Sequence, residues 1–383
     1  MINFRPGSQV HRLVTLLSVV GEFPVYSLHL LGSSQVYKRL VRKVIHEQEF
    51  RNSQTGTVVT CRLLSVSGHG KSKTIRLHRT ALPILEWISL ESYECYMRIS
   101  LNHHFSGGTN QIERNHRIAE AVALFMRLGY EFRQYKLPAL GGIHAESVRL
   151  TQNSFYNSKL LKTAAHGEAN KTTFTRMIGA LITDERCFVV YNTRGSVMKW
   201  SGMGEFKALT ALTELCKINF NKPEIVSAIL LGASDRVALE TVIASDTERR
   251  AELKFDAIYK QVYFVPLNEF GLRLMRIITL PDSDETIKEL LFESKDRSYD
   301  LGQFEYDAYI DGVYVLSHLN GDIARLIRFK KAAAADPKRD GRFEVVCFPE
   351  QAGFVTEYVG QYAAVRTIDM DLLEAELGME ESV

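Results

Sequence analysis

Apolar residues recur at helical spacing near the start of the chain, and glycines separate the segments. Residues 10–20 predict a first helix that ends at Gly21. Residues 24–31 predict a short second helix, and Gly32 separates it from a third helix over residues 35–48. Two short helices, a glycine-bearing turn and a third helix are typical of a helix-turn-helix.

The pattern that follows is that of two strands around a glycine-rich turn. Residues 57–66 (TVVTCRLLSV) are β-branched and apolar and predict one strand, and residues 73–77 (KTIRL) predict another. The sequence SGHGKS at 67–72 supplies the turn. Three helices followed by a hairpin predict a winged helix-turn-helix, and we expect residues 1–90 to form this first domain.

The third predicted helix carries its cations away from its apolar stripe. The stripe that packs on the first two helices consists of Val36, Leu40, Val41 and Val44. A helix face with an amide and four cations suits the DNA major groove, and cations of the wing would contact the flanking backbone. A solvated basic helix surface is the alternative interpretation. The predicted DNA-binding residues are Gln35, Lys38, Arg39, Arg42, Lys43, Lys71, Lys73 and Arg76.

Residues 91–165 predict a helical connector. Within it, residues 110–128 are strongly amphipathic and end at Gly129. Four histidines in this stretch lack the spacing to cysteine or carboxylate partners that a metal site needs, so we expect structural or surface roles for them. They are His103, His104, His116 and His144.

From residue 166 onward, strands alternate with helices. Residues 176–183 and 186–193 predict a β-hairpin. Strand followed by helix then recurs four times, which predicts an α/β domain over residues 166–383 with a mostly parallel sheet. The predicted strands are 225–231, 262–265, 312–316 and 343–348, and the predicted helices are 205–216, 235–244, 268–278, 322–334, 351–359 and an acidic last helix at 369–381.

Charge is distributed unevenly along the 383 residues. Residues 1–80 carry 12 Lys and Arg against 3 Asp and Glu, and the remainder carries 35 against 42, so the net charges are +9 and −7. A basic head on an acidic body is typical of a DNA-binding domain attached to a part that does not bind DNA, although chance clustering is an alternative. Residues 282–311 contain ten carboxylates and predict a solvated acidic surface that repels DNA or docks a basic partner.

Composition and cysteine usage restrict the class of protein. Apolar residues make up 45% and charged residues 24%, as in an ordinary globular protein, and no apolar run is long enough to predict a membrane span. Residues 1–10 lack the pattern of a secretory signal. The five cysteines are scattered without a CxxC, which argues against a disulfide framework or a zinc site. We therefore expect a cytoplasmic protein without membrane contact and without a cofactor.

One pattern is similar to that of metal-dependent nucleases, in which an acidic residue is followed later by Glu-x-Lys. Asp184, Glu205 and Lys207 supply these residue types, and carboxylates with a bound metal beside a lysine that orients water would hydrolyse DNA. The surrounding sequence predicts a loop that enters a helix instead of a strand. We therefore favour Glu205 and Lys207 as first-turn helix residues and expect no catalytic site. The motifs GxSxG and HExxH are absent, and no GxGxxG follows a strand.

Three segments resemble the replication-relaxation family of plasmids and integrative conjugative elements. They are QVYKRLVRKVI with the following wing and TIRLHRTALPIL, NHRIAEAVALFMRLG, and RMIGALITDERCFVVYNTRGSVMKWS. The resemblance implies a winged helix joined to a body that looks like a restriction-endonuclease fold and is often catalytically degenerate. Because the Glu-x-Lys element is misplaced for an active version, the resemblance favours DNA binding with recruitment of other proteins.

The sequence thus predicts an α+β winged-helix head followed by an α/β body, in a sequence-specific duplex-DNA-binding protein of a plasmid or integrative conjugative element. We expect it to act in replication initiation, DNA relaxation or transfer, as a homodimer that recruits a replication or transfer enzyme. Two alternatives remain open. One is a metal-dependent nuclease or nickase that the winged helix targets, and the other is a transcriptional regulator whose body binds a small effector.

Overall fold

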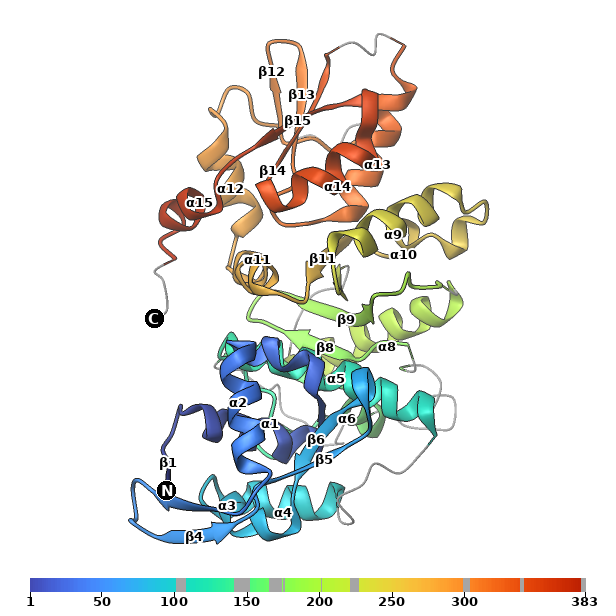
Figure 1. Ribbon diagram of the computed structural model, residues 1–383. Helices are drawn as coiled ribbons and strands as arrows, with labels where there is room; N and C mark the ends of the chain where they lie inside the picture. Colours follow the sequence, from blue (N-terminus) through green and yellow to red (C-terminus); the bar gives the residue numbers. More distant parts are fainter. Residues whose placement is uncertain are drawn as a thin grey trace. The chain divides into compact units, whose positions relative to one another are not determined.

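The chain is a mixed α/β protein (Figure 1). Contacts between its residues divide it into two units. The computed structural model describes residues 1–100, 108–140, 152–164, 174, 176–200, 202–220, 227–298, 304–337 and 341–379. The first unit comprises Met1–Gly142 and Leu150–Ala164, and the second comprises Ile143–Arg149 and Ala165–Val383. Most of the predicted connector therefore lies in the first unit.

The first unit is built around α1 (Gln9–Val20), which is buried along most of its length. The Ser8 hydroxyl caps this helix by accepting a hydrogen bond from the His11 N–H, and Gly21 ends it with a φ of 76°. Because α1 is apolar on nearly every side, it forms the core on which the other elements pack. After it come β2 (Glu22–Pro24), η1 (Val25–Leu31), α2 (Ser34–Val44), β3 (Gln48–Asn52), β4 (Val58–Cys61), β5 (Leu64–Ser67), η2 (Gly70–Ser72) and β6 (Thr74–Leu77).

Two small sheets accompany α1. One has the order β2-β6-β5, and the other has the order β1-β3-β4 with β1 at Ile2–Phe4. The prediction of one strand at 57–66 is wrong, because the chain changes sheets at Arg62 and Leu63: β4 pairs with β3, and β5 pairs with β6. The third helix also ends earlier than predicted, at Val44, because the residues that follow form β3.

Further helices cover α1. The predicted amphipathic helix is present as α5 (Thr109–Arg127), and it packs against both α1 and η1. The residues predicted as a connector thus contribute to the same core as the amino-terminal helices. The other elements of this unit are η3 (Arg79–Ala81), α3 (Leu82–Glu86), α4 (Leu90–Ile99), β7 (Ser154–Asn157) and α6 (Ser158–Ala164).

The second unit begins with the predicted hairpin. β8 (Gly179–Ile182) and β9 (Cys187–Arg194) pair antiparallel, and β9, β10 (Ser227–Gly232) and β11 (Gln261–Pro266) pair parallel. These strands are almost entirely buried, as is typical of a parallel sheet that helices cover on both faces. The accompanying helices are α8 (Met203–Phe220), α9 (Asp235–Thr247), η4 (Ala251–Leu253), α10 (Phe255–Ile258), α11 (Glu269–Thr279) and α12 (Ser283–Leu291).

A second sheet of this unit has the order β12-β13-β14-β15. The predicted strands β13 (Val313–Ser317) and β14 (Phe343–Cys347) pair parallel, and β15 (Ala364–Thr367) extends them in the same sense. The edge strands β12 (Ala308–Ile310) and β15 were not predicted, because they are only 3 and 4 residues long. The remaining elements are α13 (Ile323–Ala335), α14 (Pro349–Val359), η5 (Gly360–Tyr362) and α15 (Met370–Glu376).

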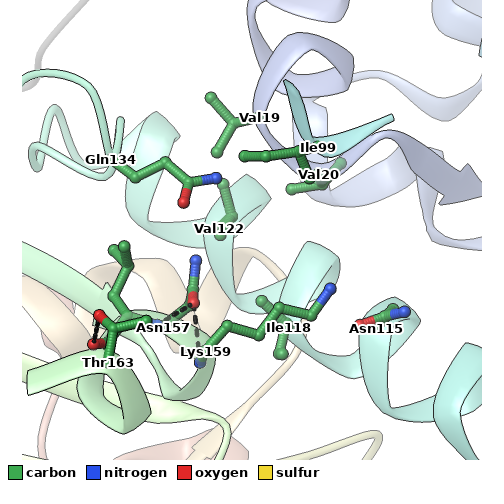
Figure 2. A pocket seen from close by; sticks show the side chains of 11 residues that line it. Val19, Val20, Ile99, Asn115, Ile118, Val122, Gln134, Asn157, Lys159 and Thr163 are labelled. Atoms are coloured by element: carbon green, nitrogen blue, oxygen red, sulfur yellow. Dashed lines mark hydrogen bonds between the residues drawn. The ribbon is translucent and has the colours of Figure 1, made fainter. Parts of the chain in front are cut away.

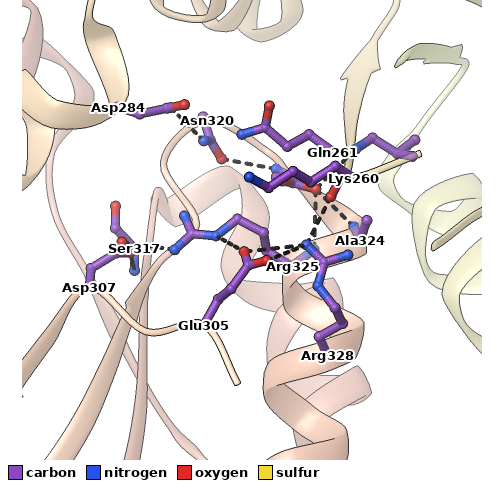
Figure 3. A network of polar contacts seen from close by, with 12 residues as sticks. Lys260, Gln261, Asp284, Glu305, Asp307, Ser317, Asn320, Ala324, Arg325 and Arg328 are labelled. Carbon is purple, nitrogen blue, oxygen red and sulfur yellow. Dashed lines mark hydrogen bonds and ion pairs between the residues drawn. The ribbon is translucent and has the colours of Figure 1, made fainter. Parts of the chain in front are cut away.

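A buried polar network surrounds the start of α13 (Figure 3). The Arg325 guanidinium lies 2.8 Å from an Asp307 carboxylate oxygen and 3.1 Å from a Glu305 carboxylate oxygen. One Asp322 carboxylate oxygen accepts hydrogen bonds from the N–H groups of Ala324 and Arg325, and also from Val262 of β11. The start of α13 is therefore joined to the backbone of β11 and to the residues that lead into β12.

The network changes the interpretation of the acidic segment at 282–311. Asp307 is almost fully buried, and Asp284 lies 3.3 Å from Arg186 and 2.9 Å from the Asn320 amide. The prediction of a wholly solvated acidic surface is wrong for these residues, because cations from elsewhere in the second unit neutralise them.

We expect Arg325→Met to lower the free energy of unfolding by about 3 to 5 kcal/mol, because it leaves the buried Asp307 carboxylate without its guanidinium. Chemical denaturation of the full chain measures this loss. Arg366→Met is the matched control, because Arg366 forms a 2.6 Å pair with Glu344 and is itself 51% exposed. The control should cost less than about 1 kcal/mol. Equal losses from the two variants would contradict a structural role for the network.

Two buried groups near α13 have pKa values displaced in opposite directions. Burial and the charge of Arg325 lower the pKa of His318 to about 3, whereas burial raises the pKa of Asp322 to about 6. His318 holds its proton more tightly in the unfolded state than in the folded state. The folded state therefore loses stability as the pH falls below 6.5, the ordinary pKa of histidine. Asp322 has the opposite effect, because the folded state holds its proton more tightly below about pH 6. Between about pH 4 and pH 6 the two effects cancel.

We therefore expect Asp322→Asn to lose stability more steeply than the wild type on acidification, because it removes only the Asp322 effect and keeps a capping oxygen. Between about pH 6 and pH 4 the extra loss is up to about 3 kcal/mol, because each pKa unit corresponds to roughly 1.4 kcal/mol. Unfolding free energies across this range measure it. Asp369→Asn, at the exposed cap of α15, should give a profile parallel to the wild type. A parallel profile for Asp322→Asn would refute the assignment.

Candidate nucleic-acid interface

One face of α2 brings together the five residues that were predicted to contact DNA from the third helix. At about 100° per residue, these side chains occupy an arc of about 140° on the helix. All five are exposed: Gln35, Lys38, Arg39, Arg42 and Lys43. The helix contains no acidic residue. Arg42 and Lys43 in its last turn interact favourably with the negative end of the helix dipole.

The buried face of α2 lies opposite this arc and differs from the predicted stripe. Tyr37, Val41 and Val44 are buried, whereas Val36 and Leu40 are only half-buried. The sequence pattern missed Tyr37 because its ring is amphipathic and follows an apolar residue. Packing through Tyr37 turns the basic face of α2 outward.

The five polar side chains of α2 are available for a partner. Within the part of the chain that the structure describes, none of them has a hydrogen bond or an ion pair. Cations that belong to a structural network are normally paired, as Arg325 is with Asp307. Unpaired cations on one helix face are what phosphate contact requires.

The connection between β5 and β6 supplies two further exposed cations, Lys71 and Lys73. Gly68 begins this turn with a φ of 77°, and a Cβ there would lie 2.4 Å from the Ser72 carbonyl oxygen, so only glycine fits. The Val25 N–H donates a 2.9 Å hydrogen bond to the Lys73 carbonyl, which holds the turn beside the start of η1.

Arg76 lies within β6 and not in the turn. It is half-buried and stands opposite Glu22 of β2. Burial would raise the pKa of the Glu22 carboxyl, but hydrogen bonds from His116 and Thr74 and the charges of His116 and Arg76 hold it below its ordinary value. We therefore assign Arg76 to the sheet and not to the exposed basic surface.

A carboxylate of α5 holds the short helix η1 in place. One Glu120 oxygen accepts a 2.6 Å hydrogen bond from the Ser27 hydroxyl and a 3.0 Å hydrogen bond from the Tyr26 hydroxyl. Glu120 is 1% exposed. The sequence contains a signal for this anchor that the prediction missed, because Glu120 is a charged residue inside the apolar run IAEAVALF. Because η1 packs directly against α2, this anchor also supports the basic face.

Of the four histidines singled out in the sequence, one has a visible role. The imidazole of His116 lies 3.1 Å from the Glu22 carboxylate, which joins α5 to β2. The other three, His103, His104 and His144, lie outside the described residues.

Comparisons with protein-family models, with curated proteins and with solved structures found no match to this chain.

The nuclease-like residues are not brought together. Asp184 is exposed in the turn before β9, and Glu205 lies in the first turn of α8, after that strand. Asp184 lies in the turn of the β8–β9 hairpin, whereas Arg176, the partner of Glu205, precedes β8 at the opposite end of that hairpin. Glu205 is buried against Arg176 at 3.1 Å, whereas Lys207 is exposed. Among the described residues, no group of three or more His, Cys, Asp or Glu side chains is placed to hold a metal ion.

Two global features accompany this interface. All five cysteines are free and buried. Within the described ranges, no helix combines the length and the apolar character that crossing a membrane requires.

We expect Glu120→Ala to lower the free energy of unfolding by about 2 to 4 kcal/mol, because the Ser27 and Tyr26 hydroxyls lose their acceptor. Denaturant titration of the full chain measures the change. Glu113→Ala, on the same helix at a half-exposed site paired with Arg117, is the control and should stay within about 1 kcal/mol. If the two variants were equally stable, Glu120 would not be an anchor.

Proposed function

We propose that the first unit is a winged helix-turn-helix that binds duplex DNA, with α2 as the recognition helix and the β5–β6 turn as the wing. The order helix, strand, short helix and helix, followed after β3 and β4 by the β5–β6 hairpin, supports this assignment, as does the sheet order β2-β6-β5. The observation that carries the proposal is the exposed basic face of α2, whose side chains have no partner among the described residues. An α-helix fits the major groove, which is about 12 Å wide, and Arg, Lys and Gln there contact guanine, adenine and phosphates.

The protein acts as a sequence-specific DNA-binding protein of a plasmid or integrative conjugative element, in replication initiation, DNA relaxation or transfer. The resemblance of three segments to the replication-relaxation family supports this role. Binding with recruitment fits better than cleavage, because Asp184, Glu205 and Lys207 do not converge. The second unit then dimerises or recruits a replication or transfer enzyme, and paired heads on two half-sites multiply a weak single-head affinity.

The direct test selects bound fragments from a genomic library of a bacterial host that carries such elements, with and without Mg²⁺. A short, uncut, salt-sensitive site is the expected result. Fragments that are nicked only when Mg²⁺ is present would instead support the alternative, a metal-dependent nuclease. Recovery of no enriched sequence would overturn sequence-specific binding.

We expect Arg39→Ala with Arg42→Ala to weaken binding to the selected site by about 100-fold or more, because each base or phosphate contact contributes about 1 to 3 kcal/mol. Fluorescence anisotropy measures the affinity, and thermal melting checks the fold. The control is Lys295→Ala with Arg366→Ala, which removes the same charge from two exposed ion pairs of the second unit. Unchanged binding in the folded α2 variant would show that α2 is not the recognition helix.

We expect Lys71→Ala with Lys73→Ala to weaken binding to the selected duplex and to random duplexes by the same factor. The reason is that wing cations contact the DNA backbone and not the bases. The slope of log affinity against log salt should become shallower by about 2. Affinities at several salt concentrations measure this slope. A selective loss on the chosen sequence would assign base recognition to the wing instead.

A further inference from the structure

The first unit contains a cavity of about 200 Å³ that the proposed DNA interface does not use (Figure 2). It lies between the end of α1, the end of α4, the middle of α5 and the start of α6. Apolar side chains form much of its wall, among them Val19 and Val20 of α1 and Ile118 and Val122 of α5. An apolar cavity with a few polar groups is the usual form of a small-molecule site.

Three carboxamides converge on this cavity: Asn115, Gln134 and Asn157 (Figure 2). The Asn157 oxygen accepts hydrogen bonds from the backbone N–H groups of Lys159 and Leu160, at 3.0 and 3.1 Å. These two bonds fix the amide, and its nitrogen has no partner among the described residues. Asn157 is only 8% exposed, so an unused donor is held at the cavity wall by the fold itself. Such a donor is satisfied by a ligand oxygen or by water.

The surroundings of the cavity are positively charged. Lys159 lines it, and the Arg114 guanidinium lies 2.9 Å from the Ser158 hydroxyl at the start of the same helix, α6. Burial, followed by the charge of Arg114, lowers the pKa of both Lys159 and Lys162. No acidic side chain is among the described residues that line the cavity. Neighbouring cations beside an amide donor favour an anionic group.

We propose that this cavity binds a small organic acid, with its carboxylate toward Lys159 and Asn157 and its apolar body between α1 and α5. The two apolar walls explain why a bare inorganic anion would leave most of the site unfilled. The carboxamides of Asn115 and Gln134 supply further hydrogen bonds at the rim. This chemistry describes a short aliphatic or aromatic carboxylate.

The position of the site couples it to the basic head, a step that rests on the proposed DNA-binding function. Val19 and Val20 end the helix that leads into β2 and η1, and Ile118 and Val122 flank Glu120, which anchors η1. A ligand held between α1 and α5 therefore fixes the support of α2. A ligand that binds better to one arrangement of η1 and α2 changes DNA affinity by the same factor as DNA changes ligand affinity.

The binding step is tested with hexanoate and benzoate on the full chain by calorimetry, with hexanamide as the uncharged counterpart of hexanoate. We expect saturable binding of at least one acid and binding of hexanamide at least tenfold weaker. Lys159→Met removes the charge but keeps the length of the side chain, and it should weaken acid binding about tenfold or more. Gln134→Leu should weaken it less, and Lys295→Met, at an exposed site of the second unit, should leave it unchanged.

The results for ligand binding and for DNA binding can fail independently of each other. Absence of saturable binding by either acid up to about 10 mM, or equal binding of hexanamide, would overturn the site. The variant Arg39→Ala with Arg42→Ala should bind the acid like the wild type, so a failure of DNA binding leaves the ligand result intact. Anisotropy with the selected duplex, with sodium chloride matched to the sodium hexanoate, then tests the coupling. Acid binding without any change in DNA affinity would refute the coupling and retain the site.

Discussion

The carboxylate of Glu120, buried in the middle of α5, determines how the first unit presents its surface. It accepts hydrogen bonds from two consecutive residues of η1, so the short helix cannot slide or turn on α5. A 3₁₀ segment of this length has little intrinsic stability and depends on such tertiary contacts. Because η1 packs on α2, the anchor also decides which face of α2 is buried through Tyr37 and which remains in solvent.

Charge is treated differently in the two units. On α2 the cations are exposed, and they are unpaired among the described residues. Exposed cations keep most of their hydration, and an anionic partner can reach them. In the second unit, Arg325 is surrounded by carboxylates and Asp322 caps the helix on which Arg325 stands. Buried charges are tolerated only when they are paired in this way. The same residue types are therefore exposed and unpaired on the described surface of α2, but buried and paired in the second unit.

The network at α13 also relates the two sheets of the second unit to each other. Asp322 reaches Val262 of β11, and the Phe264 N–H donates to the carbonyl of Gly321 at 2.9 Å. Gly321 has a φ of 73°, which a residue with a side chain rarely adopts, and its Cβ would lie 2.9 Å from the Phe264 carbonyl oxygen. The acidic segment at 282–311 supplies Asp284, Glu305 and Asp307 to this arrangement. Ion pairs within the second unit therefore neutralise part of its negative charge.

The sequence by itself determined the elements whose pattern is local. The periodicity of α1, α2 and α5, the hairpin β8–β9 and the alternation of strand and helix through β14 were all readable, because amphipathic spacing and turn residues act over a few positions. The exposed cations of α2 were readable for the same reason. Only the tertiary structure decided which segments meet: the change of sheet at Arg62, the edge strand β15, the hydrogen bonds from η1 to Glu120 and the carboxamides around the cavity. A one-dimensional pattern carries no record of such partners, least of all of Ser27 and Glu120, which lie 93 positions apart.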